Sequence, residues 1–227
     1  MPHLRREGQV FVLDLGEAGQ PETDNRLSPD ALDAIEACID EAEASQGPAA
    51  LVTTATGKFF SNGFVPELFA PDGNYLLRAQ QVFARVVASE LPTIAAVNGH
   101  AFGGAAFLAV AHDIRLMRND RGFFCLPEMD LGMPIPNGFD ALFAARVPQP
   151  TRHLAVVTAR RFGGAEAAKG GIVDLALTAE ELLPTALQLG EQQAAKRGPL
   201  LAATKKYMYS AVLDEMSRYG TPYPVEL

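Results

Sequence analysis

One stretch, from Pro92 to Asp113, constrains the fold more than any other part of the chain. It reads PTIAAVNGHAFGGAAFLAVAHD and contains no carboxylate before its last position. The apolar run at 94–97 is typical of a buried strand, and the run after Gly103 and Gly104 is typical of a buried helix. The first N–H groups of a helix have no partner within it. A strand that passes through glycines into a buried helix therefore indicates an anion site built from backbone donors.

The rest of the chain alternates between strand-like and helix-like segments, which predicts an α/β fold. Strands are expected at 9–15, 49–55, 92–99, 114–119 and 122–128. Helices are expected after an N-cap at Ser28 with Pro29 at the first position, at 75–90, 103–113, 137–146 and 151–159, and from about 179 to 217 with a break near Gly198. The mostly helical last third is expected to pack on the core or on another subunit, so we divide the chain into a core at 1–178 and a helical region at 179–227.

Charge and hydropathy exclude several classes of protein. The net charge of −8 argues against general binding to nucleic acid or to an anionic membrane. No apolar segment is long enough to span a membrane, and the N-terminus turns acidic before any signal-like apolar core develops. We therefore expect an unexported, cytoplasmic protein, in which Cys38 and Cys125 are buried thiols rather than a disulfide.

Two further segments carry candidate chemistry. The loop KFFSNGF at 58–64 contains three phenylalanines, which are unusual in a solvent loop and suggest the wall of an apolar pocket. Glu128 follows Pro127 between apolar neighbours, so we expect burial to raise the pKa of its carboxyl. Considered alone, KFFSNGF could equally be an ordinary surface loop, and Glu128 could equally be a turn residue with no catalytic role.

Other common catalytic patterns are absent from the sequence. The glycines at 103 and 104 lack the spacing of a dinucleotide-binding turn and the Lys-Ser/Thr of a phosphate loop, which disfavours NAD and ATP. No histidine has metal-ligand spacing, and no GxSxG elbow presents a serine nucleophile. His112, at the end of the buried helix, is expected to have a structural hydrogen-bonding role.

Taken together, five segments in order resemble the crotonase superfamily, the enoyl-CoA hydratase/isomerase family, over roughly residues 9–210. The wording FFSNGF is most similar to that of its plant-type Δ3,Δ2-enoyl-CoA isomerases. The matching segments are NRLS, GKFFSNGF, PTIAAVNGHAFGGAAFLAVAHDIRLM, FFCLPEMDLGM and TARRFGGAEAAKGGIVD.

The resemblance implies a spiral of repeated ββα units, usually assembled as trimers or pairs of trimers, and an acyl-CoA thioester as substrate. It implies that the N–H groups of Phe64 and Gly104 form an oxyanion hole for the thioester oxygen as it becomes an enolate. Preformed backbone donors at a dry helix terminus suit that charge. By position, the residues expected to bind substrate are Leu27, Ser61, Asn62, Gly63, Phe107 and Leu131.

The sequence departs from the hydratases at one position. They carry two glutamates, one in the glycine-led helix and one in the Pro-Glu segment, whereas this chain has Phe107 at the first place and Glu128 at the second. Hydration needs a water that is both held and deprotonated, but a double-bond shift needs one acid/base. We therefore predict a 3-enoyl-CoA isomerase of fatty acid metabolism in which Glu128 is the acid/base, with no separate cofactor and no metal.

Several alternatives remain open at this point. The same fold supports hydration, decarboxylation, dehalogenation and thioester hydrolysis, and a non-catalytic acyl-CoA-binding subunit is a further alternative. A Clp-like serine protease would need a serine near Ala105, and none is there. For the phosphates of coenzyme A, Lys58 is the nearest cation by position, with Lys205 and Lys206 as alternatives from a neighbouring subunit.

Overall fold

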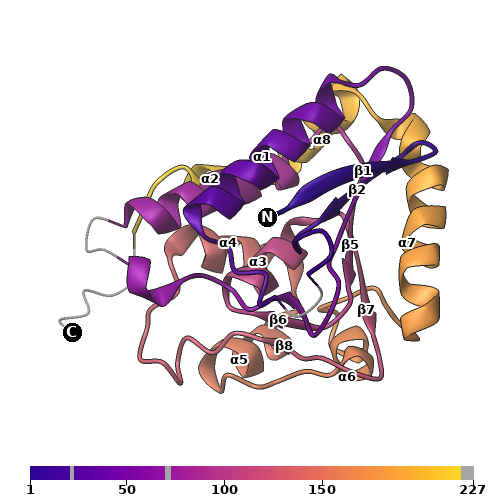
Figure 1. Ribbon diagram of the computed structural model, residues 1–227. Helices are drawn as coiled ribbons and strands as arrows, with labels where there is room; N and C mark the ends of the chain where they lie inside the picture. Colours follow the sequence, from indigo (N-terminus) through magenta and orange to yellow (C-terminus); the bar gives the residue numbers. More distant parts are fainter. Residues whose placement is uncertain (21–22, 70–72, 221–227) are drawn as a thin grey trace.

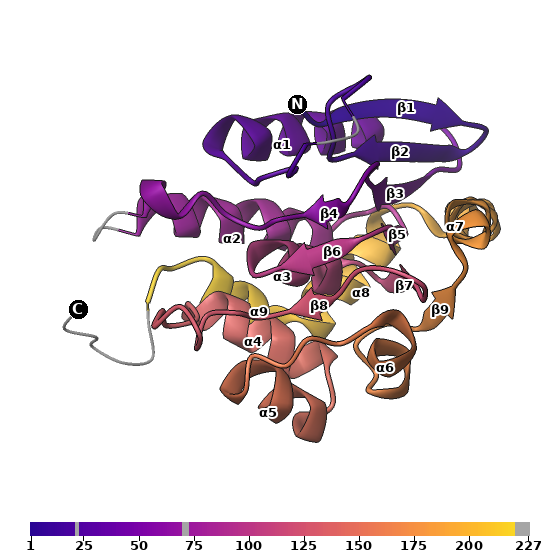
Figure 2. The same cartoon turned by 60° about the horizontal axis from the view of Figure 1, so that its bottom comes forward.

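The computed structural model describes residues 1–20, 23–69 and 73–220, and two parallel-rich sheets organise them (Figure 1). The strands of the larger sheet are β1 (His3–Glu7), β2 (Val10–Asp14), β3 (Ala50–Thr54), β5 (Thr93–Val97), β7 (Ile114–Arg118) and β9 (Leu175–Leu177). They lie in the order β1-β2-β3-β5-β7-β9, and Figure 2 shows them one below another. β1 pairs antiparallel with β2, and the other neighbours pair in parallel.

A smaller parallel sheet is interleaved with the larger one along the chain. Its strands are β4 (Phe59–Ser61), β6 (His100–Phe102) and β8 (Phe124–Cys125). The helices that follow these strands are α2 (Asn74–Val87), preceded by the short 3-10 helix η1 (Pro66–Leu68), then α3 (Gly104–Ala111) and α4 (Asn137–Arg146). The unit of two strands and a helix thus recurs as β3-β4-α2, β5-β6-α3 and β7-β8-α4. The expected spiral of ββα units is confirmed.

Amphipathic helices cover both faces of the larger sheet, which is why its central strands are buried along their whole length. All five residues of β2, β3 and β5 are buried. One face packs on α7 (Ala179–Gln193), which runs alone along that side in Figure 1. The other face joins the main core with α1 (Pro29–Ala44), whose N-cap Ser28 accepts a hydrogen bond from the Ala31 N–H as expected.

Helix α3 is the centre of this core. All eight of its residues are buried, as expected for a helix that is apolar on every side. It contacts α2 and α4 as well as β5 and β6. Because neighbours enclose it completely, its first residue, Gly104, has a fixed place relative to the rest of the fold.

The C-terminal third is helical, and its break falls where the sequence predicted it. After α5 (Gln149–Val157) and α6 (Gly164–Lys169), the chain forms β9, α7, the 3-10 helix η2 (Ala194–Lys196), α8 (Pro199–Met208) and α9 (Ser210–Met216). Gly198, between η2 and α8, has φ 138°. α7 packs on the larger sheet and α9 packs on α4 and α2. The boundary at residue 178 stays a prediction.

Some elements differ from the sequence prediction. A strand expected over 122–128 is limited to Phe124 and Cys125, because Pro127 has no N–H and its carbonyl accepts from Leu131 in a turn. A short strand, β4, occupies part of the expected loop at 57–64. β1, β6, β9 and α6 were not predicted. In the part of the chain that the structure describes, no helix combines the length and apolar character that crossing a membrane requires.

Candidate active site

A cavity of about 300 Å³ lies where the loop after β4, the start of α3 and the turn after β8 meet. Its wall is mostly apolar, and among the described residues that line it Glu128 is the one carboxylate. The lining residues are Arg26, Asn62, Gly63, Phe64, Pro66, Phe69, Phe102, Gly103, Gly104, Pro127, Glu128, Leu131 and Met133.

Glu128 is held by a tight turn, and one oxygen of its carboxylate is buried. Its carbonyl accepts from the Leu131 N–H at 3.2 Å and from the Met133 N–H at 2.8 Å, which fixes the backbone. Within the described structure its side-chain atom Oε2 is buried and has no hydrogen-bond partner. Desolvation raises the pKa of Glu128 from 4.5 to about 7, although a bond to its own backbone N–H partly opposes the shift. The expected rise is confirmed, and the carboxyl is suited to exchange a proton near neutral pH.

The helix side of the cavity begins with a glycine in a backbone conformation that other residues rarely adopt. This residue, Gly103, has φ 52°. A Cβ at Gly103 would also lie 3.2 Å from Oε1 of Glu128, so the carboxylate rests directly against this turn. At the next residue, the Gly104 N–H begins α3 and has no acceptor within the described ranges. It is therefore free to donate into the cavity.

On the loop side of the cavity, Gly63 also has a positive φ that favours glycine. Gly63 has φ 77°, and a Cβ there would come within 2.5 Å of the Phe102 carbonyl oxygen and 3.5 Å of the Gly104 nitrogen. The loop therefore approaches the start of α3 as closely as a glycine allows. The carbonyl of Gly63 accepts from the Leu27 N–H at 2.9 Å, while the Phe64 N–H has no acceptor among the described residues. The two unpaired donors thus lie on adjoining segments.

Aromatic packing fills the wall behind these donors. The Phe64 ring stacks on Phe139 with centroids 5.7 Å apart, and Phe139 stacks on Phe107 at 4.8 Å. A Cβ at Gly104 would lie only 2.6 Å from the Phe64 ring. The ring and the start of α3 therefore fix each other's position, and the surroundings keep the local dielectric constant low, which strengthens any contact with developing charge.

The structure brings most of the predicted site residues together. Asn62, Gly63, Phe64, Gly104, Glu128 and Leu131 all line the cavity. Leu27, Ser61 and Phe107 do not: each is at most 1% exposed and lies behind the wall. Their role in substrate binding stays a prediction, and in this structure they support the residues that line the cavity. Ser61 Oγ, for example, accepts from the Gly63 N–H at 3.1 Å.

Two of the lysines considered for the phosphates of coenzyme A, Lys58 and Lys205, lie outside the cavity wall. Lys58 is exposed, with its ammonium 5.1 Å from the centre of the Phe59 ring, and it does not line the cavity. Lys205 is buried, and its Nζ lies 2.6 Å from Asp113 Oδ2, so it cannot reach a phosphate and that alternative is corrected. Phe59 and Phe60 do not line the cavity either.

Sequence analysis did not predict several of the lining residues. Among these, Arg26 is the one with a charged side chain. Its guanidinium donates to the Phe64 carbonyl at 2.8 Å and lies 3.5 Å from Asp24. The signal was available, because Arg26 belongs to the NRLS segment and precedes the predicted Leu27. Met133 gave a similar signal, because it ends the FFCLPEMDLGM segment two residues after the predicted Leu131, whereas Phe69 lies outside the five segments.

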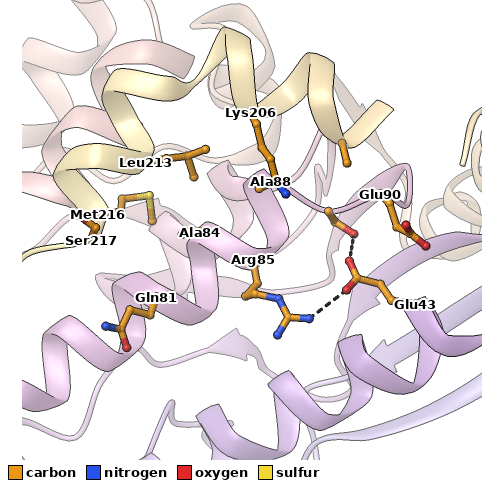
Figure 3. A pocket seen from close by; sticks show the side chains of 12 residues that line it. Glu43, Gln81, Ala84, Arg85, Ala88, Glu90, Lys206, Leu213, Met216 and Ser217 are labelled. Carbon is orange, nitrogen blue, oxygen red and sulfur yellow. Dashed lines mark hydrogen bonds and ion pairs between the residues drawn. The ribbon is translucent and has the colours of Figure 1, made fainter. Parts of the chain in front are cut away.

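A larger hollow of about 440 Å³ lies elsewhere, between α2 and the C-terminal helices (Figure 3). Arg85 lies in its wall but forms ion pairs with Glu36, Asp40 and Glu43 at 2.7 to 3.3 Å, so its charge is already satisfied. None of the predicted catalytic or oxyanion residues lines this hollow. The smaller cavity is therefore the candidate active site.

The remaining candidate residues are structural. His112 is fully buried and its ring contacts the Leu108 carbonyl and the Thr53 hydroxyl, while desolvation lowers its pKa to about 4. The expected hydrogen-bonding role is confirmed. Cys38 and Cys125 are buried free thiols, as predicted. Across residues 1–20, 23–69 and 73–220, no group of three or more His, Cys, Asp and Glu side chains is placed to hold a metal ion.

Comparison with known proteins decides the family. A family model described as enoyl-CoA hydratase/isomerase matches residues 8–220. The chain belongs to the enoyl-CoA hydratase/isomerase, or crotonase, family. This family membership agrees with the recurring ββα units and confirms the resemblance drawn from the five sequence segments.

Relatives within the crotonase family include both isomerases and a dehydratase. The peroxisomal enoyl-CoA delta isomerase 2 of Arabidopsis thaliana is 35% identical over 222 residues, covering 91% of each chain. The carnitinyl-CoA dehydratase of Shigella flexneri is 31% identical over 226 residues, covering 96% of this chain and 84% of its own. An apo structure of the Mtb enoyl-CoA isomerase superposes with a TM-score of 0.86 at 25% identity, covering 95% and 93% of the two chains.

Proposed function

We propose that this crotonase-family enzyme is an acyl-CoA isomerase that moves a double bond from the 3-position to the 2-trans position of an enoyl-CoA. The observation that supports it most is the single carboxylate of the described cavity wall. Glu128 lies against the Gly103 turn, beside two unpaired backbone donors. One desolvated acid/base and an anion site meet the needs of a proton shift along an acyl chain.

In the proposed reaction, the Glu128 carboxylate removes a proton from C2 of the 3-enoyl thioester. The electron pair of the broken C–H bond delocalises onto the thioester oxygen, and the N–H groups of Phe64 and Gly104 donate to that oxygen. The protonated Glu128 then returns its proton to C4, while the double bond moves from C3=C4 to C2=C3. Proton and charge balance with no water consumed and no cofactor required beyond the coenzyme A that the substrate carries.

A second candidate is hydration or dehydration of an acyl-CoA, which the similarity to the carnitinyl-CoA dehydratase favours. It would use the same enolate site but would need a held water. Glu128 is the one described lining residue that could serve as its base, and the rest of the wall is mostly apolar. Isomerisation is therefore the better fit.

The deciding experiment assays a 3-enoyl-CoA, a 2-enoyl-CoA and a saturated acyl-CoA in parallel. We expect the 3-enoyl substrate to gain the absorbance of a conjugated thioester, with little loss of that absorbance from the 2-enoyl substrate. Rapid formation of 3-hydroxyacyl-CoA by the unmodified protein would support the hydratase instead. Absence of any reaction would favour an acyl-CoA-binding subunit.

We also propose that the protein assembles as a trimer or a pair of trimers. Helix α8 exposes three large apolar or aromatic side chains, Leu200 at 81%, Tyr207 at 86% and Met208 at 65%, which suits an interface better than solvent. Light scattering on the purified protein tests this, and a monomer at micromolar concentration would contradict it. For the phosphates of coenzyme A, Arg26 in the cavity wall is a better-placed cation than Lys58.

A further inference from the structure

We propose that Tyr75, which lies outside the cavity on the first turn of α2, is a positioning residue for the oxyanion donor on Phe64. The inference rests on the proposed enolate-forming function. Tyr75 does not line the cavity and does not reach the reacting atoms. Its effect would pass through the loop at 63–65.

The Tyr75 hydroxyl joins the two segments that build the loop side of the cavity. It donates to the Leu27 carbonyl, and it accepts from the Val65 N–H at 3.2 Å. The Leu27 N–H in turn donates to the Gly63 carbonyl at 2.9 Å. The Tyr75 hydroxyl therefore links Val65, which follows Phe64, to Leu27, which is hydrogen-bonded to Gly63.

These bonds set the direction of the oxyanion donor. The Gly63 carbonyl and the Phe64 N–H belong to one planar peptide unit and point in opposite directions. Because Leu27 holds the carbonyl from outside, the N–H of Phe64 must point inward. Tyr75 fixes Leu27 on its carbonyl side, and its ring also packs edge-on against the Phe64 ring with centroids 5.6 Å apart.

The environment of Tyr75 favours this role. Burial raises the pKa of Tyr75, so its hydroxyl remains a neutral donor at physiological pH. Arg26, the cation nearby, donates to the Phe64 carbonyl and so supports the same loop from a second side. Preformed donors stabilise charge that develops in the transition state, so a loosened loop should slow the chemical step more than it weakens binding.

The test is Tyr75→Phe, which keeps the ring and removes the hydroxyl. We expect kcat for the 3-enoyl-CoA to fall about 3- to 10-fold, the size of one neutral hydrogen bond, with KM within about 2-fold of the parent. Exchange of the C2 protons of a saturated acyl-CoA with D₂O, which reports enolate formation directly, should slow by the same factor. The matched control is Tyr209→Phe, which removes a half-buried hydroxyl bonded to Arg146, neither of which lines the cavity, and should leave both rates unchanged.

The outcomes separate this inference from the proposed function. An active parent with an equally active Tyr75→Phe variant, or a variant altered only in KM, would overturn the positioning role alone. A parent that neither isomerises nor exchanges would overturn the proposed function and this inference with it. Should the variant not fold, amide exchange in the parent decides: the Val65 N–H should be protected by at least about 100-fold, and rapid exchange there would refute the contact.

Discussion

The two sides of the proposed oxyanion hole are built in different ways. Gly104 stands at the start of α3, a helix whose eight residues are all buried. Phe64 stands on a loop that hydrogen bonds hold to residues 24–27 and to Tyr75. Packing of a buried helix therefore fixes the first donor, whereas the second depends on polar contacts in addition to the packing of the Phe64 ring. Removing one atom can abolish a hydrogen bond, whereas the packing of a buried helix involves many side chains at once. The two sides should therefore respond differently to substitution.

Glu128 serves both sides, so its loss should have the largest effect. We expect Glu128→Gln to lower kcat for 3-enoyl-CoA by about 10²- to 10⁴-fold, the range of general acid–base catalysis, while the fold and thioester binding persist. Steady-state kinetics and titration with a saturated acyl-CoA measure the two quantities. A variant as fast as the parent would show that another group moves the proton, and neither side of the hole could then be assigned.

The helix side should be the next most sensitive. In Gly104→Val the new side chain would meet the Phe64 ring, since even a Cβ lies 2.6 Å from it, and the clash would push the two donors apart. We expect kcat to fall about 10²- to 10³-fold, as for the loss of one oxyanion donor.

The control for that substitution is Gly163→Val. Gly163 has φ −69° and a Cβ there would meet nothing within 4 Å, so the kinetics should not change. Unchanged kinetics in a folded Gly104→Val protein would mean that the start of α3 does not face the substrate.

The difference between the two sides also explains what the sequence could predict. The apolar runs at 94–97 and after Gly104 predicted β5 and α3, because packing leaves a pattern that one chain displays, whereas the short strand β6 between them was not predicted. The apolar setting of Glu128 likewise predicted its raised pKa. The contacts of Tyr75 and Arg26 with the loop join residues 10 to 48 positions apart through single atoms, and no spacing rule connects them. Phe107 was assigned to substrate because its position suggested the site, but only the folded chain shows that Phe139 and Phe143 enclose it.

The pH dependence should follow the desolvated carboxyl shared by the two sides. With the pKa of Glu128 at about 7, kcat/KM should rise with pH, about tenfold per unit well below 7, and level off above it. Because the folded pKa exceeds the unfolded value, the protonated form favours folding. That contribution is complete below about pH 4.5 and is lost as pH rises through about 7.

Thermal unfolding checks the same assignment independently of activity. The melting temperature of Glu128→Gln relative to the parent should increase between about pH 4.5 and 7, because the glutamine never has to carry a buried charge. A kcat/KM profile centred near pH 4.5, or a difference in melting temperature independent of pH, would contradict the buried state of this carboxyl.

The smallest effect should come from the exposed tie of the loop. Asn62 Nδ2 donates to Asp24 Oδ2 at 3.0 Å in solvent, while the Asn62 backbone N–H donates to the Asp24 carbonyl at 2.9 Å whatever the side chain. Asp24→Ala keeps the backbone bond and removes only solvent-screened side-chain contacts, with Asn62 and with Arg26, from a residue that does not line the cavity, so kcat should fall by about 2-fold or less. Comparing this fall in kcat with that of Tyr75→Phe shows whether enclosed or solvent-exposed hydrogen bonds hold the loop. A fall above about 10-fold would mean that water-exposed contacts also hold the Phe64 donor, and the loop side would then depend on its whole network rather than on one enclosed hydroxyl.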